Sequence, residues 1–172
     1  MARIRYVEKE TAGPDQEKIL AQLTQKSGKI ANIWKLWSHS PQTLEAFMPF
    51  NKSLVKGSLD PKLRELAYMK ASQINGCDYC GDAHKAGGRR VGVTEQQIQD
   101  IGNYSESAAF SDLEKLVLRY TEELTRTVRT SDDVMAGLKK SLSEADIVEL
   151  NLTVGMANLT NRFNMSFMTD AD

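Results

Sequence analysis

Cysteine and proline are scarce in this chain of 172 residues, and neither positive nor negative charge is in clear excess. Only two cysteines are present, whereas a secreted fold that depends on disulfides usually carries more of them along the chain. The 22 basic and 23 acidic residues give a formal net charge of −1, so no strongly basic face is available for nucleic acid. No window holds the roughly 20 near-continuous apolar residues of a membrane-spanning helix. We therefore expect neither nucleic acid nor a membrane as a partner.

The rest of the composition is that of an ordinary globular protein. Because 41% of the residues are hydrophobic and 26% are charged, the chain does not resemble a disordered protein. Its length fits one hydrophobic core, so we predict a single domain over residues 1–172. The first ten residues lack the apolar core of a signal peptide, and we expect a cytoplasmic protein. In a reducing compartment, two closely spaced cysteines are more often catalytic or metal-binding than structural.

Apolar residues recur at helical spacing, and no segment shows the sustained alternation that is typical of a strand. Pro41 and Pro61 each follow a capping residue, as proline does at the first position of a helix. Start and stop signals predict helices over residues 15–27, 41–55, 61–75, 77–86 and 94–101, from 111 to at least 124, and over 132–138 and 143–168. Gly87 and Gly88 are expected to end the helix that begins near Cys77. The predicted fold is all-α, with roughly seven or eight helices.

The last predicted helix is apolar around most of its circumference. Between Ile147 and Met168 it carries only two charges, on Glu149 and Arg162. A helix of this kind is buried, either in the core of the protein or in a contact between subunits.

One constellation of residues can carry chemistry: Glu65, Cys77, Cys80 and His84. On a helix that turns about 100° per residue, Cys77, Cys80 and His84 fall within an arc of roughly 60°. A thiol near a helix N-terminus is stabilised as a thiolate by the positive end of the helix dipole. His84, one turn after Cys80, can accept or relay its proton. Glu65 on the preceding helix is the carboxylate that could orient the imidazole.

Other interpretations fit the same residues. The two cysteines could pack as small hydrophobic side chains, or they could bind zinc together with His84 and Glu65. Structural zinc sites usually bring a second ligand pair from elsewhere, and the only other histidine, His39, is expected at the surface or at a helix end. We therefore predict no metal and no cofactor. A lyase or hydrolase that uses His84 and Glu65 as acid and base, and a non-enzymatic redox- or zinc-binding helical oligomer, are the alternatives.

The spacing Glu65-x11-Cys77-x2-Cys80-x3-His84 resembles the signature of the AhpD-like alkylhydroperoxidases, within the carboxymuconolactone decarboxylase superfamily. The sequences around it are similar as well, in the runs LRELA and INGCDYCGDAH, and so is the late pair Asn161-Arg162. The core of the motif covers residues 61–101, and the helical pattern agrees over most of the rest.

This resemblance implies a single AhpD-like helical bundle that acts as an antioxidant enzyme by reducing alkyl or hydrogen peroxides. By the same resemblance, Cys80 would attack the peroxide and become a sulfenic acid, while Cys77 would act as the resolving thiol and proton donor. Glu65 and His84 would form a proton relay. The implied partners are the peroxide, a thiol electron donor such as a lipoyl or thioredoxin-like protein, and further copies of the chain in a trimer or hexamer.

Tyr79 is the one departure from the best-known branch of that family, which has a histidine at this position. Tyrosine has an ordinary pKa near 10, so Tyr79 can donate a hydrogen bond but is a poor base at neutral pH. The lactone-decarboxylating members of the superfamily generally lack the cysteine pair. Decarboxylase chemistry with His84 and Glu65 is therefore the less favoured alternative.

Overall fold

Helices are the only regular elements in the part of the chain that the structure describes. The structure, a computed structural model, describes the backbone of residues 1–172 and all side chains except those of residues 25–27. The all-α prediction is confirmed. The chain divides into two compact units, residues 1–53 with 164–172 and residues 54–163. The prediction of one domain over the whole chain stays a prediction.

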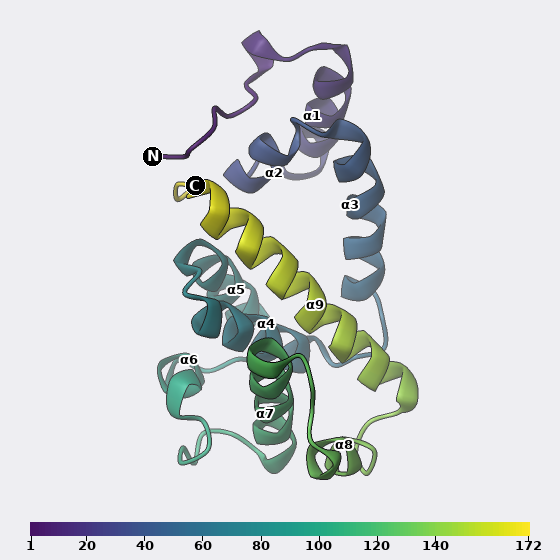
Figure 1. Cartoon of the computed structure of the whole chain (residues 1–172), viewed down its shortest axis with the longest axis vertical. Helices are drawn as coiled ribbons and strands as arrows, with labels where there is room; N and C mark the ends of the chain where they lie inside the picture. The colour runs from purple at the N-terminus through teal and green to yellow at the C-terminus, as the bar shows by residue number, and fades with distance from the viewer. The chain divides into compact units, whose positions relative to one another are not determined.

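The predicted helices are all present, and three short elements appear that the sequence did not indicate. Figure 1 labels the helices along the chain. In chain order, the elements are the 3-10 turn η1 (Lys9–Thr11), α1 (Pro14–Ser27), α2 (Asn32–Trp37), α3 (Pro41–Val55), α4 (Pro61–Asn75), α5 (Asp78–Arg90), α6 (Glu95–Asp100), the 3-10 turn η2 (Ile101–Asn103), α7 (Asp112–Thr127), α8 (Asp132–Leu138) and α9 (Glu144–Phe167). The unpredicted elements are α2, η1 and η2. Among the described residues, no helix is long and apolar enough to cross a bilayer.

Both ends of α4 are fixed by local sequence. At its start, the Asp60 side chain accepts a hydrogen bond from the Lys62 backbone N–H at 2.7 Å, and Pro61 occupies the first helical position. At its end, Gly76 adopts the left-handed conformation with φ of 67°, which glycine reaches without steric cost. Because α5 begins at Asp78, a single residue, Cys77, separates the end of α4 from the next helix.

The predicted end of α5 is wrong, because the helix runs through Gly87 and Gly88 to Arg90. The two glycines permit close packing. A Cβ atom on Gly87 would lie 2.8 Å from Glu65 Oε2, and one on Gly88 would lie 3.1 Å from a methyl carbon of Val93. Glycine inside a helix costs about 1 kcal/mol relative to alanine, which is small enough for tertiary packing to offset.

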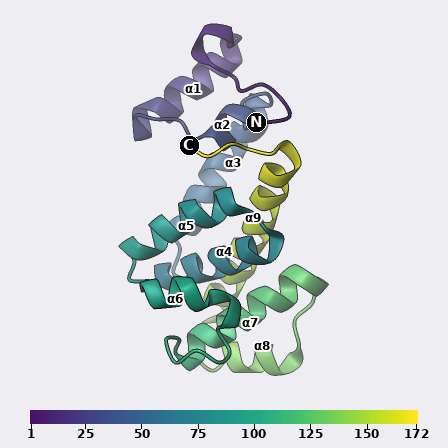
Figure 2. The same cartoon turned by 90° about the vertical axis from the view of Figure 1, so that its left-hand side faces the viewer.

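In the unit of residues 54–163, α4 packs against both α5 and α7 (Figure 2). One face of α4 contributes to an apolar cluster with α7, α8 and α9, and another contributes to a cluster with α6, η2 and α7. The first cluster consists of Leu59, Leu63, Ala67, Val117, Tyr120, Val134, Leu138, Ile147, Leu150 and Val154. The second consists of Leu66, Met69, Val93, Ile101, Tyr104, Phe110 and Leu118. Burial on two faces makes α4 a rigid support for the residues that it carries.

The last helix is buried on one side only within this chain. Ile147, Leu150 and Val154 lie in the core, as expected, whereas Leu152 and Leu159 are exposed. Val148 is exposed on the same side. An apolar stripe of this kind is available for contact with another molecule.

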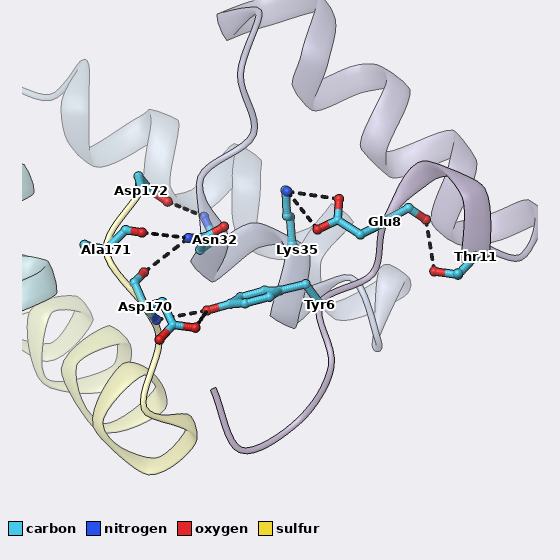
Figure 3. Close-up of polar contacts among 8 residues, drawn as sticks. All are labelled: Tyr6, Glu8, Thr11, Asn32, Lys35, Asp170, Ala171 and Asp172. Carbon is cyan, nitrogen blue, oxygen red and sulfur yellow. Dashed lines mark hydrogen bonds and ion pairs between the residues drawn. The ribbon is translucent and has the colours of Figure 1, made fainter. Parts of the chain in front are cut away.

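In the unit of residues 1–53 and 164–172, the two chain ends are joined by polar contacts (Figure 3). Tyr6 Oη donates to the Asp170 carboxylate at 3.0 Å, and Asn32 Nδ2 donates to the backbone carbonyls of Asp170 and Ala171. The same unit holds an apolar cluster of Ile19, Leu23 and Leu44. His39 is exposed just beyond the end of α2, as expected, with Nε2 2.8 Å from the Arg5 carbonyl oxygen.

Candidate active site

The two cysteines lie at the junction of α4 and α5 and are joined by a disulfide. Cys77 is the capping residue of α5, and its Sγ accepts a hydrogen bond from the Cys80 backbone N–H at 3.4 Å. The Cys77 N–H itself donates to the Ser72 carbonyl at 3.0 Å, which holds the junction on the end of α4. Only 2% of Cys77 and 4% of Cys80 is exposed. Both sulfurs therefore lie at a helix N-terminus, where the dipole favours a thiolate once the pair is reduced.

Glu65 and His84 meet across the packed helices α4 and α5. His84 Nδ1 lies 2.8 Å from Glu65 Oε2, and both side chains are partly buried. An ionised carboxylate only accepts hydrogen bonds, so with this partner Nδ1 is the donor, and a neutral ring with its hydrogen on Nδ1 has Nε2 as its basic atom. His84 follows Cys80 by four residues on α5, so the two side chains share one face of that helix. The sequence-predicted contact between the carboxylate and the imidazole is present.

Tyr68 is a further member of the site, and the sequence did not identify it. Its ring stacks on the imidazole of His84, with the ring centroids 3.5 Å apart and the planes 13° from parallel. Its hydroxyl lies 2.5 Å from Thr160 Oγ1 on α9. Burial raises the pKa of Tyr68 to about 12, and the nearby charge of Glu65 raises it as well. Tyr68 is thus a neutral phenol that fixes the plane of the His84 ring.

Some of these contacts had a sequence signal and some had none. Tyr68 follows Glu65 by three residues, so the two side chains are neighbours on α4. Thr160 lies 92 positions from Tyr68 in sequence, and nothing local to either residue indicates their contact.

A buried amide network supports the end of α4 below the cysteines. Asn161 is fully buried, and its Nδ2 donates to Ser72 Oγ at 3.1 Å. Asn75 Nδ2 donates to the Oδ1 atoms of Asn161 and Asn158, at 2.9 and 3.0 Å. Arg162 donates to Asn158 Oδ1 at 2.7 Å. The pair Asn161-Arg162, which the resemblance singled out, therefore belongs to the frame that holds the α4–α5 junction.

A cavity of about 340 Å³ opens beside Cys77, between the second half of α4, the start of α5 and the α6–η2 segment. It is lined by Met69, Ser72, Gln73, Gly76, Cys77, Asp78, Gly81, Lys85, Ile98, Gln99, Ile101 and Gly102. Cys77 forms part of its wall, whereas Cys80 is not among the lining residues. The two cysteines of one disulfide therefore differ in whether they line the cavity.

Tyr79 lies in the first turn of α5 between the two cysteines and is half-buried. Its predicted role as a hydrogen-bond donor stays a prediction. Among the side chains that the structure describes, no three Cys, His, Asp or Glu residues form a group that could hold a metal ion.

The chain matches known proteins over the region that carries this site. The model of the carboxymuconolactone decarboxylase family matches residues 41–123, from the start of α3 into α7. The uncharacterized protein YdfG of Bacillus subtilis is 29% identical over 129 residues, which are 74% of this chain and 88% of YdfG.

Solved structures give the same result. A protein of unknown function from Agrobacterium tumefaciens, provisionally assigned to the antioxidant defence protein AhpD, is 27% identical with a TM-score of 0.74, over 80% of this chain and 95% of that one. An uncharacterized peroxidase-related protein with an alkylhydroperoxidase AhpD core, from Ralstonia eutropha JMP134, has a TM-score of 0.85 over 99% of this chain and 92% of its own. At 18% identity, the second likeness shows the fold alone. The chain is therefore similar to the carboxymuconolactone decarboxylase family over residues 41–123 and has the fold of AhpD-like proteins.

Proposed function

We propose that this protein reduces alkyl or hydrogen peroxides with electrons from a thiol, through the Cys77–Cys80 pair. The observation that carries the proposal is the 2.8 Å contact between Glu65 on α4 and His84 on α5, the helix that Cys77 caps and that contains Cys80. A thiolate, a neighbouring base and a carboxylate that orients the base are the groups that an activated sulfur nucleophile needs. Similarity to the carboxymuconolactone decarboxylase family and to a protein provisionally assigned to AhpD supports the same chemistry. The scheme needs no cofactor and no metal.

In the first step, His84 Nε2 takes the proton of the Cys80 thiol, and Glu65 stabilises the resulting imidazolium. The Cys80 thiolate then attacks the terminal oxygen of the peroxide ROOH. The O–O bond breaks, Cys80 becomes a sulfenic acid, and the alkoxide leaves as the alcohol after it takes the proton from His84. The sulfur is oxidised by two electrons and the peroxide is reduced by two.

In the second step, Cys77 resolves the sulfenic acid. The Cys77 thiolate attacks Cys80 Sγ, the S–O bond breaks, and hydroxide leaves as water with the proton that Cys77 gave up. The product is the Cys77–Cys80 disulfide. A thiol donor, such as a lipoyl or thioredoxin-like protein, must then return two electrons to the pair.

Two properties of the working protein are part of this proposal. The exposed apolar side of α9, with Val148, Leu152 and Leu159, supports a homo-oligomer, which we propose is a trimer or a hexamer. Light-scattering mass measurement of the wild type and of Leu159→Glu tests it, since a charge in a buried contact should dissociate the assembly. We also propose a cytoplasmic location, because a reducing compartment supplies the thiol donor.

The catalytic proposal is tested with the reduced wild type and the variants Cys80→Ser and Cys77→Ser, each treated with stoichiometric cumene hydroperoxide and a sulfenate-trapping reagent. Cys80→Ser should lose peroxide consumption, while Cys77→Ser should consume one equivalent and accumulate trapped sulfenic acid at Cys80. His39→Gln is the control, because His39 is the one histidine outside the site. A Cys80→Ser protein that still consumes peroxide like the wild type would contradict the assignment. Activity on a cyclic lactone that survives the loss of both thiols would favour the lyase alternative.

A further inference from the structure

The two cysteines of the disulfide differ in their relation to the cavity. Cys77 forms part of the wall of the 340 Å³ cavity, and Cys80 does not line it. Gly76 and Gly81 line the same cavity, and a Cβ atom on either glycine would meet no atom within 4 Å. These glycines place no side chain between Cys77 and the cavity, although only 2% of Cys77 is exposed.

The cavity is much larger than a peroxide group requires. Sites that take small organic molecules measure about 300–1,000 Å³, whereas a water molecule occupies about 30 Å³ of liquid. Its lining combines the apolar side chains of Met69, Ile98 and Ile101 with the amides of Gln73 and Gln99. Such a lining suits an organic chain that carries polar atoms.

We propose that this cavity binds the reducing dithiol and that Cys77 is the sulfur which that dithiol attacks. The inference rests on the proposed function, because it assigns the second half of the same catalytic cycle. It adds a separate binding site for the electron donor and a direction for the exchange, with Cys80 as the leaving sulfur.

The exchange is balanced as follows. One thiolate of the dithiol attacks Cys77 Sγ, the Cys77–Cys80 bond breaks, and Cys80 leaves as a thiolate with the bonding electron pair. The second thiolate of the dithiol then attacks its partner sulfur in the mixed disulfide and releases Cys77. The dithiol becomes a disulfide, the protein gains two electrons, and the two protons of the dithiol go to the two protein thiols through solvent.

Attack on Cys77 releases Cys80 as a thiolate, which is the form that the peroxide step requires. Cys80 is freed in the first turn of α5, where the helix N-terminus stabilises a thiolate and so makes it a better leaving group. His84, four residues further along α5, can exchange a proton with it. An attack on Cys80 would instead leave the donor attached to the sulfur that must meet the peroxide.

The first test locates the mixed disulfide. The wild-type protein is oxidised with diamide, treated briefly with glutathione, quenched in acid and alkylated with N-ethylmaleimide, and fragment ions then separate adducts at Cys77 from those at Cys80. We expect glutathione to be at least about tenfold more abundant on Cys77, because access decides which sulfur is attacked. Equal amounts, or an excess on Cys80, overturn the inference. Since diamide forms the disulfide without peroxide, the result is independent of whether the protein is a peroxidase.

The second test uses a variant in which a larger side chain narrows the cavity. A Cβ atom on Gly102 would meet only Gln73 Nε2, at 3.6 Å, so Gly102→Leu can be accommodated while its side chain enters the cavity. Asn103→Leu, at the next position of η2 and outside the lining, is the matched control. Reduction of the diamide-formed disulfide by dithiothreitol should be about tenfold slower in Gly102→Leu and unchanged in Asn103→Leu. Equal rates in the two variants overturn the assignment of the cavity.

Discussion

The relay side of the disulfide, defined by Glu65, Tyr68 and His84, differs from its cavity side, where Cys77 lines the cavity of about 340 Å³. On the relay side each ring is held by its neighbours: Glu65 contacts His84 at 2.8 Å and Tyr68 stacks on the imidazole. On the cavity side three glycines, Gly76, Gly81 and Gly102, are part of the lining. A rigid side suits proton transfer to a small substrate, and an open side suits the arrival of a larger one.

This difference explains how one disulfide could take part in two unlike reactions. The peroxide step needs a base held within hydrogen-bond reach, whereas thiol exchange needs a clear approach to one sulfur. If the two reactions use opposite sides of the pair, a substitution on one side should change one half of the cycle and spare the other. The predictions that follow test this separation.

The largest effect is expected from the relay itself. Glu65→Gln and His84→Gln should slow the oxidation of the reduced protein by cumene hydroperoxide by about 10²- to 10⁴-fold, the usual contribution of a positioned acid–base group. Stopped-flow measurement of thiol loss gives the rate. Reduction of the diamide-formed disulfide by dithiothreitol, measured in the same variants, should change much less. Equal losses in both half-reactions would contradict the separation of the two sides.

A smaller effect should follow from crowding the relay. A Cβ atom on Gly87 would lie 2.8 Å from Glu65 Oε2, so Gly87→Ala should push the carboxylate away from His84. We expect oxidation by peroxide to be about tenfold slower, as for a displaced general acid–base group. Ala86→Val is the control, because Ala86 is the preceding residue of α5 and is exposed. A rate for Gly87→Ala equal to that of the control would show that the close approach has no role in the relay.

Tyr68 should have a positioning effect that is smaller again. Tyr68→Phe keeps a ring on the imidazole and should slow peroxide oxidation by no more than about threefold, whereas Tyr68→Leu removes the stack and should slow it by about tenfold. A purely structural role would lower the thermal midpoint without changing the pH profile of the rate. A positioning role should change the pH profile of the rate for Tyr68→Leu and leave the profile unchanged for Tyr68→Phe.

The sequence could predict those contacts of the site that join residues close together in the chain, but not those that join distant residues. Glu65, Cys77, Cys80 and His84 lie within 20 positions on two consecutive helices, so helical geometry alone indicated that they come together. The contact of Tyr68 with Thr160 joins α4 to α9, and no local pattern reports on a pairing of that range. The cavity could not be predicted from the sequence either, because it is bounded by segments that are separated in sequence.

The helix positions were predictable for a related reason. Caps at Asp60, Thr94 and Ser111 act within three residues, and each accepts the hydrogen bond that its pattern indicates. Gly87 and Gly88 misled the prediction, since glycine reads as a stop in sequence but here serves close packing against Glu65 and Val93. A glycine inside a helix can be interpreted only when its neighbours in space are known.

The last expected effect concerns the stability of the protein at high pH and involves Tyr68 alone. Because burial raises the pKa of Tyr68 to about 12 while the unfolded value is near 10, the unfolded chain releases this proton first as the pH rises. The contribution of the protonated Tyr68 to the free energy of unfolding is therefore fully present below pH 10. It declines between pH 10 and 12, by up to about 2–3 kcal/mol. Urea unfolding of the wild type and Tyr68→Phe at pH 9 and pH 11 measures it. Tyr68→Phe should lose less stability than the wild type over this interval, and equal losses would show that the phenol is not buried as described.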